Sequence, residues 1–353
     1  MGKNNKTVKL HQAMKLLQIQ AYLVLALVFI STSCLQAQKT PAQPTQLNLK
    51  EVIDKASKVE GLTGLILSKQ GKIIGEKYFH TQTRQKLNEV RSVTKSIMSL
   101  LIGIAIDQQL IKSVDDPIGK YLGDMKGYAK RRHGKITVRH LLTMSSGIDW
   151  DESSVTLHRQ WRKEPITALL ERPIAHKPGT KFYYSTAASY LLSVILTKAS
   201  GMPTLAFAQR NFFRPLGIQQ VQWEKLGGYY HGGSRLRLKP RDMLRIGELM
   251  LNDGAYQGKQ IIPRKWVQEA TRLQISINKS TSYGYLWWSE NSVPDKNFGA
   301  VGYGGQFIVV FPTLKLIIVT TAFSRGIGVA KAAKQEHDIG QLIGKTIYPF
   351  LKQ

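Results

Sequence analysis

The chain has 353 residues, 42% of them apolar and 21% charged, which is enough for one large domain or two closely packed ones and is unlike a disordered chain. Lys and Arg outnumber Asp and Glu by 50 to 23, but they are spread along the whole chain without a zinc-finger spacing, an RNA-recognition signature or a heptad array. We therefore expect no nucleic-acid binding and a solvated basic surface that favours an anionic cell-envelope partner at long range; the densest basic runs are residues 130–132 and 235–245.

Residues 1–37 predict a secretory signal peptide. The first twenty residues hold four lysines and no acid, and the apolar run 21–30 is about half the ~20 residues of a membrane-spanning helix. The small residues that follow allow two processing events, cleavage after Ala37 or lipid attachment at Cys34, which the intact mass of the mature protein distinguishes. We expect an exported protein, periplasmic or extracellular, with a linker at 38–46 and a folded domain at 47–353.

The folded part changes its pattern twice along the chain. It begins with a predicted helix at 49–57 and two strands, 64–68 and 72–79, joined by a turn. A mainly helical stretch follows, with helices at 92–109, 138–142, 187–198, 205–213, 240–252 and 263–270. Strands at 283–288, 306–311 and 315–321 then precede a C-terminal helix at 328–351.

This order predicts an α+β fold with a single antiparallel sheet built from both ends of the chain. The sheet region would combine residues 47–90 with 282–353, and the helical region, 91–281, would be a large insertion between them. A site where the two regions meet is the natural expectation.

Ser92 and Lys95 are the strongest candidates for chemistry. They begin a helix that is apolar on nearly all sides, and a spacing of three places them on one helix face. A serine hydroxyl needs a base to act as a nucleophile, and a lysine in an apolar pocket is driven toward its neutral, basic form. The same spacing recurs at Ser276 and Lys279 in a polar stretch, so the buried helix, not the spacing, distinguishes Ser92.

Two further segments carry hydroxyl groups and glycines. Residues 178–186 form a Pro-Gly turn and an extended piece that ends in Tyr184, Ser185 and Thr186, and residues 302–306 are glycine-rich and precede a strand. Either alone is typical of a structural turn. No GxSxG, HExxH or Walker A motif occurs, and one cysteine cannot form an intrachain disulfide or a multi-cysteine zinc site, so we expect no metal and no cofactor.

Taken together and in this order, the three segments resemble the serine β-lactamase and penicillin-binding-protein superfamily. The resemblance is closer to its branch of class C β-lactamases, D-alanyl-D-alanine carboxypeptidases, esterases and 6-aminohexanoate-oligomer hydrolases, and residues 136–150, 236–243 and 302–311 support it. It implies a β-lactamase/transpeptidase-like fold. It also implies these roles: Ser92 as the acyl-accepting nucleophile, Lys95 as its base partner, Tyr184 as the proton relay, Gly305 as the glycine of the Lys/His-x-Gly motif, and the N–H groups of Ser92 and Gln306 as the oxyanion hole.

Two departures from the family pattern concern the substrate. Thr186 stands where the family has Asn, and Tyr303 stands where β-lactamases have a lysine that helps to hold the substrate carboxylate. The loss of such a cation would cost about 1.5–3 kcal/mol of binding. We therefore expect an enzyme that acts on a small amide, peptide or ester. A true class C-type β-lactamase or D-alanyl-D-alanine carboxypeptidase, and an inactive penicillin- or cell-wall-binding module, are the alternatives. Which of Lys95 and Tyr184 is the base in each half-reaction, and the oligomeric state, stay open.

Overall fold

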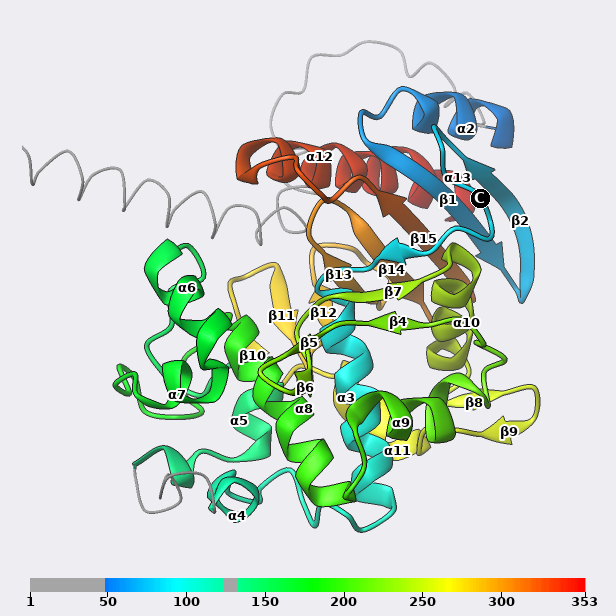
Figure 1. Cartoon of the computed structure of the whole chain (residues 1–353). Coiled ribbons are helices and arrows are strands. Elements are labelled where there is room, and N and C mark those ends of the chain that lie inside the picture. Colours follow the sequence, from blue (N-terminus) through cyan, green and yellow to red (C-terminus); the bar gives the residue numbers. More distant parts are fainter. Residues whose placement is uncertain (1–47, 124–131, 353) are drawn as a thin grey trace, which may run out of the picture.

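The main sheet is built from both ends of the chain, which confirms the predicted fold class. The computed structural model describes residues 48–123 and 132–352, so the predicted signal peptide and linker lie outside the described residues. Every neighbouring pair in the sheet is antiparallel. The blue strand β1 lies beside β15 from the other end of the chain, and β2 lies on the outer side of β1 (Figure 1). The eight strands, in spatial order, are β10 (Ile275–Ser276), β11 (Thr281–Tyr283), β12 (Trp288–Glu290), β13 (Phe298–Gly302), β14 (Gln306–Phe311), β15 (Leu316–Ala322), β1 (Leu62–Lys69) and β2 (Lys72–Tyr78).

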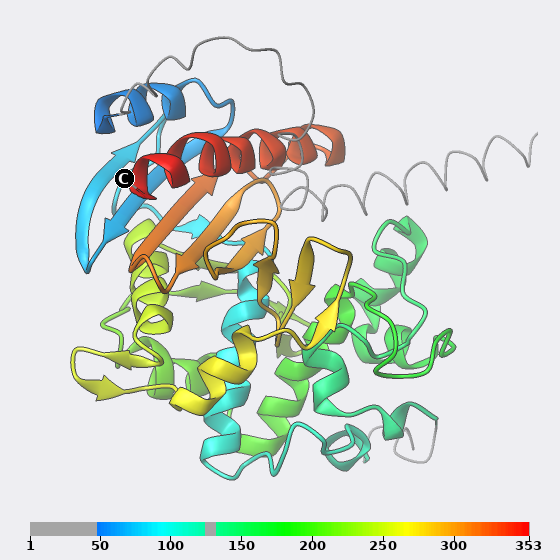
Figure 2. The ribbon, with the colours of Figure 1, turned by 180° about the vertical axis from the view of Figure 1, so that it is seen from behind.

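The two faces of this sheet contribute to two separate hydrophobic cores. In β1, Leu65 and Leu67 belong to one core and Ile66 to the other, because successive side chains of a strand point to opposite faces. Helices α2 (Leu49–Ser57) and α12 (Val329–Leu342) cover the first face, and Figure 2 shows α12 lying across the strands. Helices α3 (Val93–Asp107) and α10 (Pro240–Leu251) pack against the second face.

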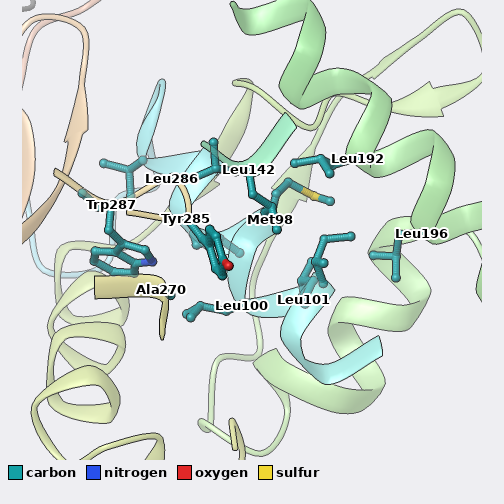
Figure 3. Packing of buried hydrophobic residues seen from close by; sticks show 14 of the residues in the cluster. Met98, Leu100, Leu101, Leu142, Leu192, Leu196, Ala270, Tyr285, Leu286 and Trp287 are labelled. Atoms are coloured by element: carbon teal, nitrogen blue, oxygen red, sulfur yellow. The ribbon is translucent and has the colours of Figure 1, made fainter. Parts of the chain in front are cut away.

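Helix α3 runs through the centre of the larger core. All of its residues from Val93 to Ala105 are buried, because apolar side chains surround it on every side. Figure 3 shows Met98, Leu100 and Leu101 of α3 among side chains from the insertion and from the segment that leads into β12. The start of this helix, where Ser92 lies, is therefore held by both regions of the molecule.

No single described helix has the length and apolar composition to cross a membrane; one pair bent by 78°, Thr186–Ser200 with Thr204–Phe213, passes that test together.

The insertion is mainly helical but contains short strands that the sequence pattern did not predict. The further helices are α4 (Gly119–Leu122), α5 (Val138–Leu142), α6 (Val155–Lys163), α7 (Pro165–Leu170), α8 (Thr186–Ser200), α9 (Thr204–Ala208) and α11 (Arg264–Thr271). The short strands are β3 (Asn88–Glu89), β4 (Gln222–Trp223) and β7 (Leu236–Leu238) in one sheet, and the pairs β5 (Lys225–Leu226) with β6 (Tyr229–Tyr230) and β8 (Ala255–Tyr256) with β9 (Lys259–Gln260).

The predicted strand at 283–288 was wrong. The chain reverses there between β11 and β12: the Gly284 N–H donates to the Trp287 carbonyl oxygen at 2.8 Å, and Leu286 has a left-handed φ of 62°. Tyr283 to Trp288 are all buried, and their apolar side chains give the sequence the pattern of a strand where the chain in fact turns. The predicted C-terminal helix also changes: α12 ends at Leu342 and passes through a π-helical turn, Ile343–Ile347, into α13 (Tyr348–Lys352).

The packing of α3 against α11 gives a stability prediction. A Cβ atom on Gly103 would lie 2.4 Å from Trp266 Cδ1. Alanine normally stabilises a helix by about 1 kcal/mol relative to glycine, whereas overpacking a core costs about 1–3 kcal/mol. We expect Gly103→Ala to lower the free energy of unfolding in a urea titration, and to cost less in a Trp266→Leu background. A more stable single variant would contradict this packing.

Candidate functional site

Ser92 lies at the N-terminal end of α3 with its hydroxyl available. It occupies the N-cap position, yet its side chain makes no capping hydrogen bond, and it is half-buried. The residue before it, Arg91, has a left-handed φ of 51°, a conformation that costs a non-glycine residue about 1–3 kcal/mol. This backbone turn brings β3 into α3 and leaves the Ser92 hydroxyl within reach of Lys95.

Lys95 is buried with three hydrogen-bond partners. Only 1% of the residue is exposed, and its Nζ lies 3.0 Å from Ser92 Oγ, 3.1 Å from Thr186 Oγ1 and 2.8 Å from the Gly233 carbonyl oxygen. Burial lowers the pKa of Lys95 to about 7, although the negative charge of Glu152 raises it in part. A substantial fraction of the amine is therefore neutral near pH 7 and can accept the proton of Ser92.

Tyr184 lies against both members of this pair. Lys95 Nζ is 4.8 Å from the centroid of the Tyr184 ring. The ring of Trp288 stacks on that of Tyr184, with 6.1 Å between the two ring centroids. Burial raises the pKa of Tyr184, and a side-chain hydrogen bond with Ser92 lowers it only in part. Tyr184 thus keeps its proton at neutral pH, so it can donate a proton while Lys95 accepts one.

Thr186, the first residue of α8, joins the same cluster through its bond to Lys95. Its backbone N–H donates to the carboxylate of Glu152. Glu152 also lies 3.9 Å from the Nε2 atom of His158. Glu152 stands in a polar loop before α6 with no motif around it, so the sequence gives no signal for it; only the fold brings its charge near Lys95.

In the glycine-rich segment, the structure brings Gly302, rather than Gly305, next to the segment that leads into Ser92. A Cβ atom on Gly302 would lie 2.4 Å from the Val90 carbonyl oxygen, in the segment that leads into Ser92. A Cβ atom on Gly305 would instead lie 2.4 Å from Ile339 Cδ1 of α12, on the other side of the sheet. The two glycines thus lie at the same hairpin but meet different neighbours.

The side chains of Tyr303 and Gln306 are both engaged in structural bonds. The Tyr303 hydroxyl donates to the Gly328 carbonyl oxygen at 2.8 Å, and its ring lies 5.7 Å from the guanidinium carbon of Arg91. Gln306 is fully buried, and its side-chain amide makes two bonds to the backbone of Ala322, at 2.8 and 3.1 Å. Gln306 therefore fastens β14 to the end of β15, and across the hairpin it pairs with Gly302.

Two residues of α12 form hydrogen bonds with the hairpin between β13 and β14. Glu336 accepts a hydrogen bond from the Gly304 N–H at 2.6 Å, while Gln335 donates to the Gly304 carbonyl oxygen and, at 2.8 Å, to that of Phe323. Glu336 is only 5% exposed, and burial raises its pKa to about 8. Its charge also raises the pKa of both Tyr184 and Tyr303, so it lies close to the candidate site. The sequence carries no signal for this role, because Gln335 and Glu336 stand in a polar run typical of a solvent-facing helix.

The structure therefore gathers Ser92, Lys95, Tyr184 and Thr186 into one group and places the Gly302 end of β13 beside it. A hydroxyl, an amine that can be neutral and a phenol that keeps its proton are the parts needed for nucleophilic attack on a carbonyl group. Within residues 48–123 and 132–352 no group of three or more His, Cys, Asp or Glu side chains is arranged to hold a metal ion.

Comparisons with known proteins agree on one family. A family model described as "Beta-lactamase" matches residues 49–339. "Uncharacterized protein BpOF4_21049" of Alkalihalophilus pseudofirmus is 24% identical over 270 residues, which is 67% of this chain and 74% of that protein. Among solved structures, "Putative 6-aminohexanoate-dimer hydrolase from Bacillus anthracis" has a TM-score of 0.73 at 19% identity and covers 86% of this chain and 81% of that one. A "putative beta-lactamase from Bacteroides dorei DSM 17855" has a TM-score of 0.69 at 20% identity and covers 86% and 97%. At these identities the two structures show a shared fold.

The lowered pKa of Lys95 predicts how the reactivity of Ser92 depends on pH. Only the neutral amine can accept the serine proton, so labelling of Ser92 by a fluorophosphonate probe should rise with pH through about pH 7 and level off below about pH 8. Lys95→Met should slow labelling by about 10²-fold or more, the range of general-base catalysis. Lys279→Met, in the exposed Ser276 and Lys279 pair, is the matched control and should change nothing; an equal effect of both variants would rule out this role for Lys95.

The burial of Glu336 predicts a decline on the alkaline side. Above about pH 8 its carboxyl group ionises and disfavours negative charge beside Tyr184 and Tyr303, the titratable groups that face it. Glu336→Gln keeps an acceptor for the Gly304 N–H but carries no charge, so its labelling rate should stay level above pH 8 while that of the wild type falls. Asp338→Asn, on the same helix and paired with Lys334 at 2.6 Å, should keep the wild-type decline. A decline that persists in Glu336→Gln would assign it to another group.

Proposed function

The chain belongs to the beta-lactamase family, and on that basis we propose that it is a serine hydrolase that forms an acyl-enzyme at Ser92. The observation that carries the proposal is the position of Lys95, which is 1% exposed with its Nζ 3.0 Å from Ser92 Oγ. A buried amine is costly to a fold unless it is paired or has a chemical task. The leader pattern of residues 1–37 supports placing this activity outside the cytoplasm, which is part of the same proposal.

In the proposed acylation step, neutral Lys95 takes the proton from Ser92 as Oγ bonds to the substrate carbonyl carbon. The carbonyl oxygen then becomes negatively charged, and backbone N–H groups stabilise it. We assign these donors to Ser92 and Tyr303, in place of Gln306, because Gly302 is the glycine that abuts the nucleophile segment. The bond to the leaving group breaks as Tyr184 donates its proton to that group and regains one from protonated Lys95.

The second half-reaction runs the same proton path in reverse. A water molecule loses a proton to the Tyr184 and Lys95 pair as its oxygen attacks the acyl carbon. The bond to Ser92 Oγ breaks, Oγ recovers a proton from the same pair, and a carboxylic acid leaves. In both steps Lys95 is the net base, because the pKa of Tyr184 lies too high for it to be ionised at neutral pH.

The proposed substrate is a neutral or weakly charged small amide, short peptide or ester. The Tyr303 hydroxyl is bonded to Gly328, and the Arg91 guanidinium is paired with Glu89 at 3.1 Å and donates to the Ser324 carbonyl oxygen. Tyr303 carries no positive charge, and the charge of Arg91 is already paired with Glu89, so neither side chain supplies a cation for a substrate carboxylate. The name of the Bacillus anthracis protein describes an amide-dimer hydrolase, which supports including amides.

The test is covalent labelling followed by turnover. Mass spectrometry after treatment with a fluorophosphonate should find one adduct, on the peptide that contains Ser92, and Ser92→Ala should lose it. Hydrolysis of a nitrophenyl ester or of a short amide oligomer should fall by about 10³-fold or more in Ser92→Ala, as expected for loss of a nucleophile.

The same assays separate the alternatives. If a chromogenic cephalosporin is turned over faster than the ester and the amide, the protein is a β-lactamase in activity. An absent adduct in a protein that still binds penicillin would favour a non-catalytic binding module.

A further inference from the structure

A cavity of about 370 Å³ lies where three surface segments of the molecule meet. Its volume falls within the range of small-molecule sites, but those are usually lined by apolar and aromatic side chains, and this one has neither kind. None of its residues belongs to the Ser92 group. The lining comes from the loop before β3 (Arg84, Gln85), the loop before β4 (Gly217, Gln219, Gln220) and the start of α10 (Lys239, Arg241, Asp242, Arg245).

Four of these side chains are cationic, and their charges are only partly balanced. Arg84 and Arg241 both bind Glu76, with Nη2 atoms 3.0 and 2.6 Å from Oε2. The hydrogen bond from Arg241 is the main reason that the pKa of Glu76 falls to about 2, so this carboxylate stays ionised. Glu76 thus orients two guanidinium groups, and Asp242 and Glu248 also act on Arg245, so the four cations face three carboxylates.

The other two cations also keep donors available. Arg245 uses Nη1 for Asp242 at 2.6 Å, and its Nε and Nη2 take part in none of the hydrogen bonds among the described residues. The Lys239 ammonium donates to the neutral Gln85 amide at 2.9 Å, and no ion pair joins it to an acid in the described part of the chain. The first turn of the 12-residue helix α10 lies at the same place and adds the positive end of its dipole.

We propose that this cavity binds a phosphate-bearing ligand. Planar guanidinium groups match the geometry of phosphate oxygens, and the three glutamines can donate or accept further hydrogen bonds. Lys239, Arg241 and Arg245 come from the basic run 235–245, and the proposed hydrolysis assigns no role to any of these three residues. The source of the phosphate is either a free phosphorylated compound or an anionic phospholipid headgroup.

The experiment measures binding of inorganic pyrophosphate to the mature protein by isothermal titration calorimetry. We expect one saturable site whose dissociation constant rises at least tenfold in Lys239→Gln and in Arg245→Gln, since each variant removes a charged hydrogen-bond donor. Lys259→Gln removes the same charge from the exposed strand β9 and should leave the dissociation constant unchanged. Thermal melting of each variant checks that the fold is intact.

Vesicles of phosphatidylglycerol form the second arm and separate the two sources. Loss of vesicle binding in Lys239→Gln assigns the site to a lipid headgroup, and unchanged vesicle binding assigns it to a free phosphorylated compound. The proposal is overturned if pyrophosphate binds without saturation, if it does not bind, or if Lys259→Gln weakens binding as much as Lys239→Gln does.

Discussion

The burial of one amine at the start of a wholly apolar helix is the constraint on which the rest of the site depends. Lys95 receives its partners from three places: Ser92 in its own turn, Thr186 at the start of α8, and Gly233 in the loop before β7. Each contact depends on the position of the helix start or loop that carries the partner of Lys95. The pKa of about 7 follows from this enclosure, because water is excluded and only Glu152 opposes the loss of charge. The reactivity proposed for Ser92 is therefore a property of the packing around α3 as much as of Ser92 itself.

How well the sequence predicted each part depends on how local its physical cause is. Ser92 and Lys95 could be paired because three-residue spacing and an apolar helix are local features, and Thr186 was found because it stands in a short motif beside Tyr184. The reversal at Gly284 was missed because the buried side chains around it outweigh the turn signal. Gly302 and Gly305 look alike in the sequence, and only their neighbours distinguish them: Val90, just after β3, for Gly302 and Ile339 of α12 for Gly305.

A shortage of acids shapes the surface of this protein. With 50 basic residues against 23 acidic ones, single carboxylates serve several arginines: Glu76 holds Arg84 and Arg241, and Glu224 holds Arg235 and Arg237. Such sharing fixes the guanidinium groups in place and leaves part of their charge uncancelled. The basic excess is thereby concentrated at defined positions, and the cavity at the start of α10 is one of them.

The hydrogen bonds between α12 and Gly304 affect when, during synthesis, the candidate site around Ser92 is completed. The hairpin beside Ser92 is held by Gln335 and Glu336, which stand more than 200 residues after Ser92 in the chain and therefore leave the ribosome later than Ser92 does. A nascent chain that already contains Ser92, Lys95 and Tyr184 still lacks α12, the helix that supports the hairpin. The candidate site is thus incomplete in a nascent chain until β13, β14, β15 and α12 have been synthesised and have packed together.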